Sequence, residues 1–287
     1  MKIASYNIQF GIGTDGRYDL NRIAASLEGA DIIALQEVTR GFPGNDGRDM
    51  VAEIEALFPG HFAAFGAGAD MHLDFSRTNG RIVERRLQFG NMLLSRYPLL
   101  SLRHLLLPRS RTLDRLNYQR SALEGVVETP AGALRVYSTH LDHMSVDERL
   151  AQIGFLRKRL SGFAMEGSAM TGGAEYGLAD PPMAEDFILL GDFNMEPESE
   201  DYLAMVGRRE LDGTRNLRAG QPVDIFDRLG ARAGNAITWT HPSFENGEGK
   251  WVDYVFVSPG LAPRMRGARV DRDAKGSDHF PLWVTLA

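Results

Sequence analysis

The sequence of 287 residues contains no cysteine. Disulfide bonds and thiolate metal sites are therefore excluded, and any bound ion must be held by oxygen or imidazole ligands. No apolar run is long enough to span a bilayer, and the first residues enter a strand pattern without the charged and apolar regions of a secretion signal. We therefore expect a cytoplasmic protein without integral membrane association.

The chain also lacks an overall positive charge, because 32 lysines and arginines stand against 38 acidic residues, which gives a net charge of −6. This balance disfavours a protein whose whole surface binds nucleic acid. Residues 73–120 differ from the remainder, since they contain ten arginines and no lysine against three acidic residues. These arginines could contact phosphate, or they could form a solvated rim paired with the acidic remainder.

An apolar fraction of 43% is ample for a sizeable core, and no internal repeat or low-complexity linker divides the chain. We therefore expect one domain over residues 1–287. Many strand patterns, few helices and hairpins in mid-chain indicate two packed sheets with helices outside. The expected helices cover residues 18–27, 48–58, 146–160, 199–206 and 223–229, and the expected strands include 2–10, 31–36, 61–65, 89–95, 187–190 and 237–240.

Two segments have no clear pattern. Residues 70–88 are polar and rich in arginine, and they form either a hairpin or a surface excursion. Residues 161–185 are rich in glycine, alanine and methionine, and a loop of this length is a lid, a binding loop or disordered. The sequence shows no exposed aromatic hairpin of a kind that could enter a membrane.

The stretch from Phe187 to Glu196 reads Phe-Ile-Leu-Leu-Gly-Asp-Phe-Asn-Met-Glu. Its four apolar residues predict a short strand buried on both faces, and Gly191 lets the backbone turn tightly. Asp192 and Asn194 follow two residues apart, so both would face the same side of an extended chain. Taken alone, this Asp-x-Asn pattern is equally typical of a turn.

Other apolar runs also end on polar groups that can bind metal or move protons. These groups are Asn7, Glu37, His140, Asp253 and the Ser277-Asp278-His279 triplet. Catalytic groups cluster where several strands deliver their ends to one face. The repeated pattern therefore indicates a functional site rather than a set of ordinary turns.

The segments Ser5-Tyr-Asn-Ile8, Leu35-Gln-Glu-Val38, Ser138-Thr-His-Leu141, Gly191-Asp-Phe-Asn194, Val252-Asp-Tyr-Val255 and Ser277-Asp-His279 follow one another in this order. In this order the chain resembles the endonuclease/exonuclease/phosphatase superfamily over nearly its full length. The resemblance implies a four-layer α/β/β/α sandwich. It also implies Mg²⁺- or Mn²⁺-dependent hydrolysis of a phosphate ester.

The resemblance makes Glu37 the principal metal ligand, with Asn7 and Asp278 beside it. A small number of hard oxygen ligands suits an ion that keeps several water ligands and also binds a substrate phosphate. By the same resemblance, His279 is the general base or orients the attacking water, and Asp253 fixes its tautomer.

Asp192 would hold or deprotonate the nucleophilic water, or serve the leaving group. Asn194 and His140 would donate hydrogen bonds to the non-bridging phosphate oxygens as charge builds. Arg120 lies where similar proteins carry an arginine that faces the phosphate, a task that suits the guanidinium fork. His143 is a weaker candidate for the site, and we interpret Trp239 as a packing residue rather than a base-stacking platform.

The histidine of Thr139-His-Leu141 is found in branches similar to sphingomyelinases, deoxyribonuclease-I-like nucleases and phosphoinositide phosphatases. Exonuclease-III-type repair enzymes carry a different segment there, so an apurinic-site nuclease is disfavoured. We expect a phosphodiesterase or phosphatase that acts on a small or lipid-like substrate. The alternatives are a metal-dependent endo- or exonuclease acting on DNA or RNA, and a non-catalytic binding protein on the same fold.

Overall fold

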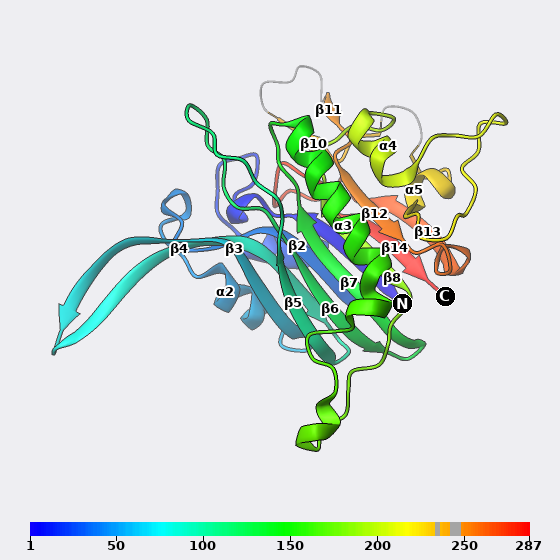
Figure 1. Cartoon of the computed structure of the whole chain (residues 1–287). Helices are drawn as coiled ribbons and strands as arrows, with labels where there is room; N and C mark the ends of the chain where they lie inside the picture. The colour runs from blue at the N-terminus through cyan, green and yellow to red at the C-terminus, as the bar shows by residue number, and fades with distance from the viewer. Residues whose placement is uncertain (233–235, 242–247) are drawn as a thin grey trace.

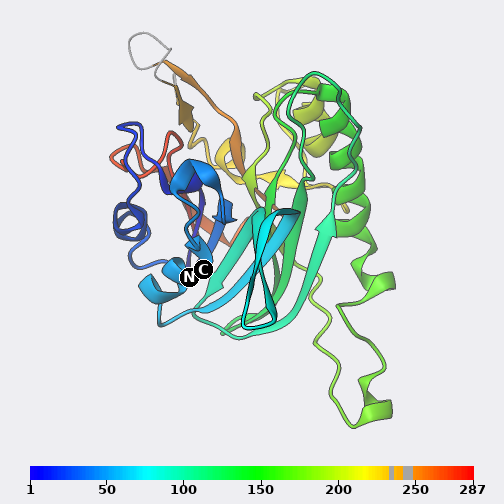
Figure 2. The same ribbon diagram turned by 90° about the vertical axis from the view of Figure 1, so that its left-hand side faces the viewer.

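The computed structural model describes residues 1–232, 236–241 and 248–287. Two six-stranded mixed sheets pack face to face, and helices cover their outer faces (Figures 1 and 2). The view in Figure 2 shows the four layers edge-on, with α1 and α2 outside one sheet and α3 outside the other. The expected four-layer sandwich is therefore confirmed.

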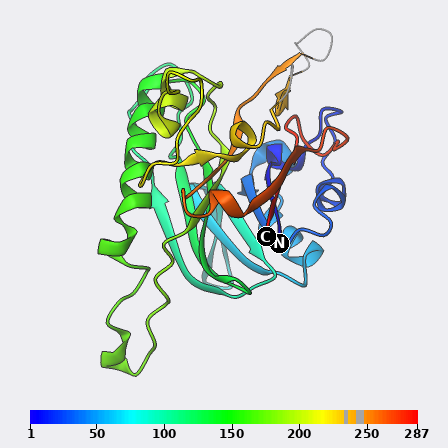
Figure 3. The same cartoon turned by 90° about the vertical axis from the view of Figure 1, so that its right-hand side faces the viewer.

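The first sheet has the strand order β13-β14-β1-β2-β4-β3. β1 runs parallel to β2 and antiparallel to β14. The amino group of Met1 donates to the carbonyl oxygen of Leu286 over 2.8 Å, so the two termini lie side by side (Figure 3). The strands of this sheet are β1 (Lys2–Asn7), β2 (Ile32–Arg40), β3 (Phe62–Thr78), β4 (Arg81–Ser95), β13 (Met265–Val270) and β14 (Leu282–Leu286).

The second sheet has the order β5-β6-β7-β8-β12-β9, and only β7 and β8 among its neighbouring pairs run parallel. All six residues of β8 are buried, as the apolar run predicted. The strands are β5 (Leu99–Leu106), β6 (Ser121–Thr129), β7 (Gly132–His140), β8 (Phe187–Asp192), β9 (Val223–Asp224) and β12 (Asp253–Val257), and a separate pair is formed by β10 (Trp239–Thr240) and β11 (Gly249–Lys250).

The helices begin at side chains that accept hydrogen bonds from the first turn, such as Asp49 at α2 and Ser145 at α3. Their apolar faces pack on the sheets, and no helix in the described ranges has the length and apolar character needed to cross a bilayer. The helices are α1 (Leu20–Ser26), α2 (Met50–Leu57), α3 (Val146–Glu166), α4 (Glu200–Val206) and α5 (Ile225–Arg228), with short 3-10 turns η1 (Gln9–Gly11), η2 (Pro43–Asn45), η3 (Gly173–Tyr176) and η5 (Ala262–Arg264).

Helix α3 extends six residues beyond its expected end and stops at Glu166. The extra turns bury Phe163, whose ring lies against the guanidinium groups of Arg103, Arg135 and Arg159. This packing outweighs the weak helix signal of the sequence there. The loop before β8 therefore starts at Gly167, and it contains the short turn η3.

The segment at 70–88 is a hairpin, because β3 and β4 remain paired far beyond the sheet and project from the body (Figure 1). The expected short strand at 61–65 is thus only the beginning of β3. Cross-strand ion pairs, such as Arg85 with Asp74 and Arg86 with Asp70, hold the hairpin together. The side chain of Phe75 is 56% exposed on it, so the hairpin presents an aromatic residue to solvent.

Smaller differences concern element ends. β1 ends at Asn7 rather than at residue 10, because Gln9 and Phe10 adopt positive φ angles in η1. Residues 223–229 form the short strand β9 and then a helix of four residues, and only Trp239 and Thr240 of the expected strand 237–240 pair with another strand. Gly191 lies within β8, where a Cβ atom would sit 1.9 Å from the carbonyl oxygen of Thr139. Glycine is needed there for close approach of two strands rather than for a turn.

Candidate active site

Three neighbouring strands of the second sheet carry polar residues at the same level. His140 ends β7, Asp192 ends β8 and Asp253 begins β12. His140 is paired with Asp192 in the parallel ladder, and Asp192 is paired with Asp253 in the antiparallel one. This register brings one imidazole and two carboxylates to a single sheet edge.

The first sheet adds groups from the facing edge. Asn7 ends β1, while Glu37 lies at an irregularity of β2, where the pairing with β4 shifts between Leu35 and Val38. Glu37 has a φ angle of 60°, which is uncommon for a residue other than glycine. The bulge therefore re-aims this carboxylate relative to a regular strand.

The last two candidates come from the segment before β14. The hydroxyl of Ser277 donates to the backbone oxygen of Asn7 over 2.8 Å, which ties this segment to the end of β1. The backbone N–H of His279 in turn donates to the Ser277 hydroxyl. Asp278 and His279 are thereby held beside Asn7, although 270 residues separate the two parts of the chain.

A cavity of about 540 Å³ opens at this edge. Asn7 and Asp253 are not among its lining residues, but each contacts one that is. The Nδ2 of Asn7 donates to Asp192 over 3.0 Å, and Asp253 contacts His279. The candidate residues that line the cavity are Glu37, Arg120, His140, Asp192, Asn194, Asp278 and His279.

His279 and Asp253 form a buried pair in which Nδ1 of the imidazole lies 2.9 Å from Oδ2 of the carboxylate. Burial opposes a charge on His279, but Asp253, Asp192 and Asp278 outweigh it and raise the pKa of the imidazole to about 10. The other ring nitrogen, Nε2, lies 3.7 Å from Asp192. In this arrangement Nδ1 is committed to Asp253, and Nε2 is the nitrogen that faces the cavity groups.

Asp192 lies between the two histidines, since its Oδ2 is 3.3 Å from Nε2 of His140 and 3.7 Å from Nε2 of His279. Burial and the neighbouring Asp253 raise the pKa of Asp192 to about 6, against the hydrogen bonds from Asn194 and Asn7. The Asn194 backbone N–H donates to Oδ1 over 2.9 Å. Asp192 thus remains available as an acceptor near neutral pH.

His140 and Asn194 contact each other through Nε2 and Nδ2 at 3.1 Å. Burial, together with the charge of Arg120, holds the pKa of His140 well below its ordinary value, so this imidazole is neutral. Its Nδ1 lies 3.9 Å from Glu37 and has no hydrogen-bond partner within the described residues. The Nδ2 of Asn194 also donates to the backbone oxygen of Leu141 over 3.2 Å, so Nδ1 of His140 is the nitrogen of this pair that is left without a partner within the described residues.

The carboxylates have the character of a cation site. Glu37 accepts no hydrogen bond from the described residues, and burial raises its pKa to about 7, with Asp278 and Asp192 adding to the effect of burial. Buried carboxylates without matching donors are stabilised by a cation. Oxygen ligands of this kind fit Mg²⁺ or Mn²⁺, so the residues present fit the ion that the resemblance implies.

A second grouping could also hold a metal ion. Asp192, Asp253 and His279 each offer a ligand atom, and these atoms lie within 4.8 Å of one another. This group differs from the expected set of Glu37, Asn7 and Asp278. Its histidine is already engaged with Asp253 through Nδ1, so the pair has the geometry of a proton-transfer couple as well.

Arg120 is 3% exposed and lines the cavity. Its guanidinium lies over the ring of Tyr118, and Nη2 is 2.9 Å from Nδ1 of His143. Within the described residues it forms no ion pair, and its Nε and Nη1 have no hydrogen-bond partner. A buried and unpaired guanidinium beside a cavity is suited to a phosphate.

The sequence analysis underestimated the aromatic side chains that line the cavity. The indole N–H of Trp239 donates to Oδ2 of Asp278 over 3.0 Å, so this residue orients a candidate ligand besides lining the cavity. Tyr118 lines the cavity below Arg120, and Lys250 pairs with Glu196 at the rim. A single aromatic residue in a short strand gives no periodic signal that could have revealed this role.

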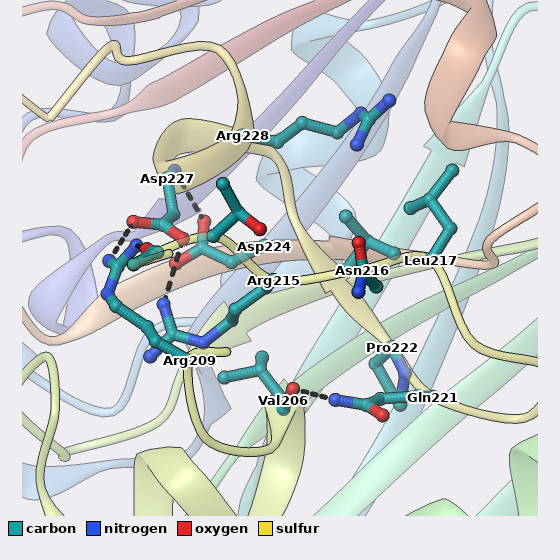
Figure 4. A pocket seen from close by; sticks show the side chains of 13 residues that line it. Val206, Arg209, Arg215, Asn216, Leu217, Gln221, Pro222, Asp224, Asp227 and Arg228 are labelled. Atoms are coloured by element: carbon teal, nitrogen blue, oxygen red, sulfur yellow. Dashed lines mark hydrogen bonds and ion pairs between the residues drawn. The ribbon is translucent and has the colours of Figure 1, made fainter. Parts of the chain in front are cut away.

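Another hollow of about 320 Å³ lies near α4 and α5 (Figure 4). Arg209 and Arg215 reach into it, but both form ion pairs with Asp227 and with Glu198. Their positive charge is thereby neutralised. Arg228 also lines the hollow and forms no ion pair within the described residues, but it is exposed, whereas the unpaired Arg120 of the candidate active site is buried.

The arginine-rich segment divides into two groups. Arg85, Arg86, Arg96 and Arg103 form ion pairs with acidic side chains, as expected for a structural role. Other arginines form no ion pair within the described residues, and apart from Arg120 they lie on exposed parts of the surface. This second group comprises Arg77, Arg81, Arg109, Arg111, Arg115 and Arg120.

The model of the endonuclease/exonuclease/phosphatase family matches residues 4–279. A search of curated proteins finds no match. Solved structures with the same fold include an endonuclease/exonuclease/phosphatase from Beutenbergia cavernae, with 20% identity, a TM-score of 0.66 and coverage of 99% of this chain and 70% of that one. A mannosyl-6-phosphatase from Bacteroides thetaiotaomicron has 18% identity, a TM-score of 0.64 and coverage of 100% and 99%.

A 3′ phosphatase from Neisseria, bound to a product DNA hairpin, has 16% identity, a TM-score of 0.61 and coverage of 100% of this chain and 99% of that one. These likenesses in structure show the fold. The family model in addition covers nearly the whole sequence, including every segment that contributes to the cavity. This chain therefore belongs to the endonuclease/exonuclease/phosphatase family.

Proposed function

We propose that the protein is a divalent-metal-dependent hydrolase of phosphate esters, and that residues 1–287 act as one domain. The observation that carries the proposal is the pair of His279 and Asp253 placed beside the unpaired carboxylate of Glu37 and the unpaired guanidinium of Arg120. A proton-transfer couple, a cation site and a phosphate clamp around one cavity meet the needs of phosphate-ester hydrolysis.

Glu37 and Asp278, with Asn7 behind them, would hold Mg²⁺ or Mn²⁺. When bound, such an ion polarises a phosphoryl oxygen and stabilises charge on the leaving oxygen. Trp239 keeps Asp278 oriented through its indole N–H. A hydrogen bond to a metal-ligating carboxylate fixes the orientation of that carboxylate and so raises the affinity of the site for the metal.

His279 exchanges a proton at Nε2, because Asp253 holds Nδ1 as the protonated nitrogen. The negative charge of Asp253, Asp192 and Asp278 favours the imidazolium, and a bound cation would offset part of that charge and leave Nε2 available as a base. Asp192 accepts a hydrogen bond from the attacking water and holds it between the two histidines. Water attack is thus assisted by His279 with Asp253, and by Asp192.

The opposite wall receives the phosphate. Arg120 lines the cavity with Nε and Nη1 that have no partner within the described residues, and His140 offers its unpartnered Nδ1. Asn194 would donate to a non-bridging oxygen by exchanging one of the contacts that its Nδ2 makes with His140 and Leu141. These donors act on charge that builds as water attacks, so their contribution is larger in the transition state than in the bound substrate.

The test is a hydrolysis screen with Mg²⁺, Mn²⁺ or EDTA. Its substrates are bis-p-nitrophenyl phosphate, p-nitrophenyl phosphate, a phosphoinositide, sphingomyelin, single-stranded DNA, plasmid DNA and RNA. We expect metal-dependent hydrolysis of the small or lipid-like esters that disappears in His279→Ala. Hydrolysis confined to the nucleic acids would instead show a nuclease, and no metal-dependent hydrolysis of any of them would support a binding protein.

A further inference from the structure

The projecting part of the β3–β4 hairpin, residues 68–88, is here named the arm (Figure 1). It is a two-stranded ribbon outside the packed sheets, and such a ribbon cannot bury its own side chains. Apolar residues nevertheless gather on it with side chains that are 37–61% exposed, which is unusual for a surface without a partner. They are Met71, Leu73, Phe75, Ile82 and Val83.

Charge is distributed unevenly along the arm. Near the sheet, Arg85 and Arg86 are neutralised by the ion pairs described above. Toward the tip, Arg77 and Arg81 form no ion pair within the described residues, and Arg77 lies opposite Ile82 in the ladder. The tip therefore combines unpaired guanidinium groups with exposed apolar side chains.

Residues 108–117, here named the cavity loop, repeat this combination. Leu113 is 85% exposed and Leu116 is 76% exposed, and the three arginines of the loop have no ion pair within the described residues. The base of the loop is fixed, because Asn117 and Ser110 both donate to Glu148 of α3. Its apolar and cationic side chains are thus presented to solvent on a supported base.

Both elements are connected to the cavity. Leu116 of the cavity loop lines it. At the root of the arm, the ring of Phe89 lies 4.3 Å from that of Tyr118, another lining residue. In Figure 1 the arm and the cavity loop project toward the same side, away from α4, and Figure 2 looks onto that side with the arm directed at the viewer.

We propose that the arm tip and the cavity loop dock onto an anionic phospholipid bilayer, with the arginines at the lipid phosphates and the apolar side chains in the interfacial layer. Each exposed cation near an anionic membrane strengthens binding about fivefold, and apolar side chains add to the binding. The net charge of −6 would repel the protein from such a membrane in other orientations. Docking by this side is therefore orientation-specific.

Other partners fit these side chains less well. A nucleic acid would use the arginines, but it would leave the aliphatic groups of Leu113, Ile82 and Val83 without a contact, since single strands stack on aromatic rings. A second copy of the chain could cover the apolar groups, but it would place like charges against each other. The bilayer is the partner that accommodates both kinds of side chain.

The proposal extends the proposed function, since the phosphate ester hydrolysed in the cavity would then be displayed at a membrane surface. The test is co-sedimentation of the full chain with vesicles of phosphatidylcholine alone and of phosphatidylcholine mixed with phosphatidylglycerol. We expect binding to the mixed vesicles that weakens with salt. Arg77→Glu with Arg81→Glu, and separately Ile82→Asp with Val83→Asp, should each lower the bound-to-free ratio at least about tenfold.

The matched control is Arg208→Glu with Leu211→Asp, in the exposed loop after α4. This change has the same chemistry at a distant site and should leave vesicle binding unaltered. A Leu113→Asp variant tests the cavity loop independently of the arm. Thermal melting of the same proteins checks that the variants remain folded. Hydrolysis of bis-p-nitrophenyl phosphate separates the two proposals, because a failure of the proposed function would leave the vesicle result standing.

Three results would overturn the docking proposal. The first is no binding to the mixed vesicles, or binding that the control variant weakens equally. The second is tight binding of an oligonucleotide that only the arm variants lose, without binding to vesicles, which would assign the surface to nucleic acid. The third is a dimer in solution, seen by analytical ultracentrifugation, that the arm variants dissociate.

Discussion

Oδ2 of Asp253 lies 2.9 Å from Nδ1 of His279, and this contact leaves Nε2 as the ring nitrogen that faces the cavity. Asp253→Asn preserves the shape of this contact but removes the charge that holds the imidazole. We expect kcat to fall about 10²–10⁴-fold, the range typical of a lost acid–base group. Initial-rate assays with a soluble diester measure kcat. A kcat near that of the parent protein would show that the pair of His279 and Asp253 does not take part in the reaction.

Glu37→Gln removes the charge of the proposed principal metal ligand. We expect hydrolysis to fall by several orders of magnitude and the thermal stabilisation by Mg²⁺ to disappear, because a ligand that binds only the folded state raises Tm. In EDTA, where no metal is bound, the substitution should raise rather than lower thermal stability near neutral pH. Burial raises the pKa of Glu37 from 4.5 to about 7, so the folded protein loses stability as pH rises between these two values, and the loss is complete above about 7. The variant should then be at least as stable as the parent at pH values above about 7.

Trp239→Phe keeps an aromatic ring in the cavity wall but deletes the N–H that holds Asp278. We expect the Mg²⁺ concentration for half-maximal activity to rise about 10–100-fold, while kcat at saturating metal changes little. Trp283→Phe is the matched control, since the indole N–H of Trp283 has no hydrogen-bond partner within the described residues. An equal rise in both variants would point to a packing effect instead.

Arg120→Lys keeps the positive charge but loses the planar fork. Because Nε and Nη1 of Arg120 have no hydrogen-bond partner within the described residues and are proposed to bind phosphate, we expect kcat/KM to fall about 10²-fold or more. Arg77→Lys, on the exposed arm, should leave hydrolysis of a small soluble ester unchanged. If Arg120→Lys retained the parent kcat/KM, the guanidinium would have only a structural role.

Asp227 gives a prediction for stability against pH. Burial opposes its charge, but Arg209 and Arg215 outweigh burial and hold the pKa of this carboxyl below its usual value. Its contribution is therefore present above the unfolded pKa of about 3.9 and is lost as pH falls through the lower folded value. Asp227→Asn should have a lower Tm than the parent at neutral pH, and the gap should close below about pH 4.

Asp273→Asn, at an exposed carboxylate without an ion pair within the described residues, serves as the control for general charge effects. Its Tm should follow that of the parent throughout the titration. A difference between parent and Asp227→Asn that stays constant into acid would show that lost packing, rather than charge, causes the destabilisation.

The position of the site could be predicted because strand ends have a strong signal. A buried apolar run followed by Asp192, or by His140, places the polar group at a sheet edge whatever the packing of the rest. The direction of the Glu37 side chain could not be predicted, because its positive φ angle depends on a bulge that only the pairing of β2 with β4 defines. The same holds for Trp239, whose partner lies 39 residues away.

The arm shows a different limit of sequence reasoning. In β3, Met71, Leu73 and Phe75 alternate with polar residues, but β4 has adjacent apolar residues at Ile82 and Val83 followed by a charged run, so the period of two is missing from one of the two strands. The extension of α3 to Glu166 was hidden for a related reason. Burial of Phe163 under three arginines is a tertiary contact, and the local sequence gives no sign of it.

The alignment of His140, Asp192 and Asp253 across three strands restricts how the gene can change in length. One codon inserted inside β7, β8 or β12 would shift the register by one residue and turn the catalytic side chain to the opposite face of the sheet. The loop between α3 and β8 and the loop after α4 carry no such constraint. Insertions and deletions that leave a working enzyme should therefore accumulate in these loops, while the three strands keep their lengths.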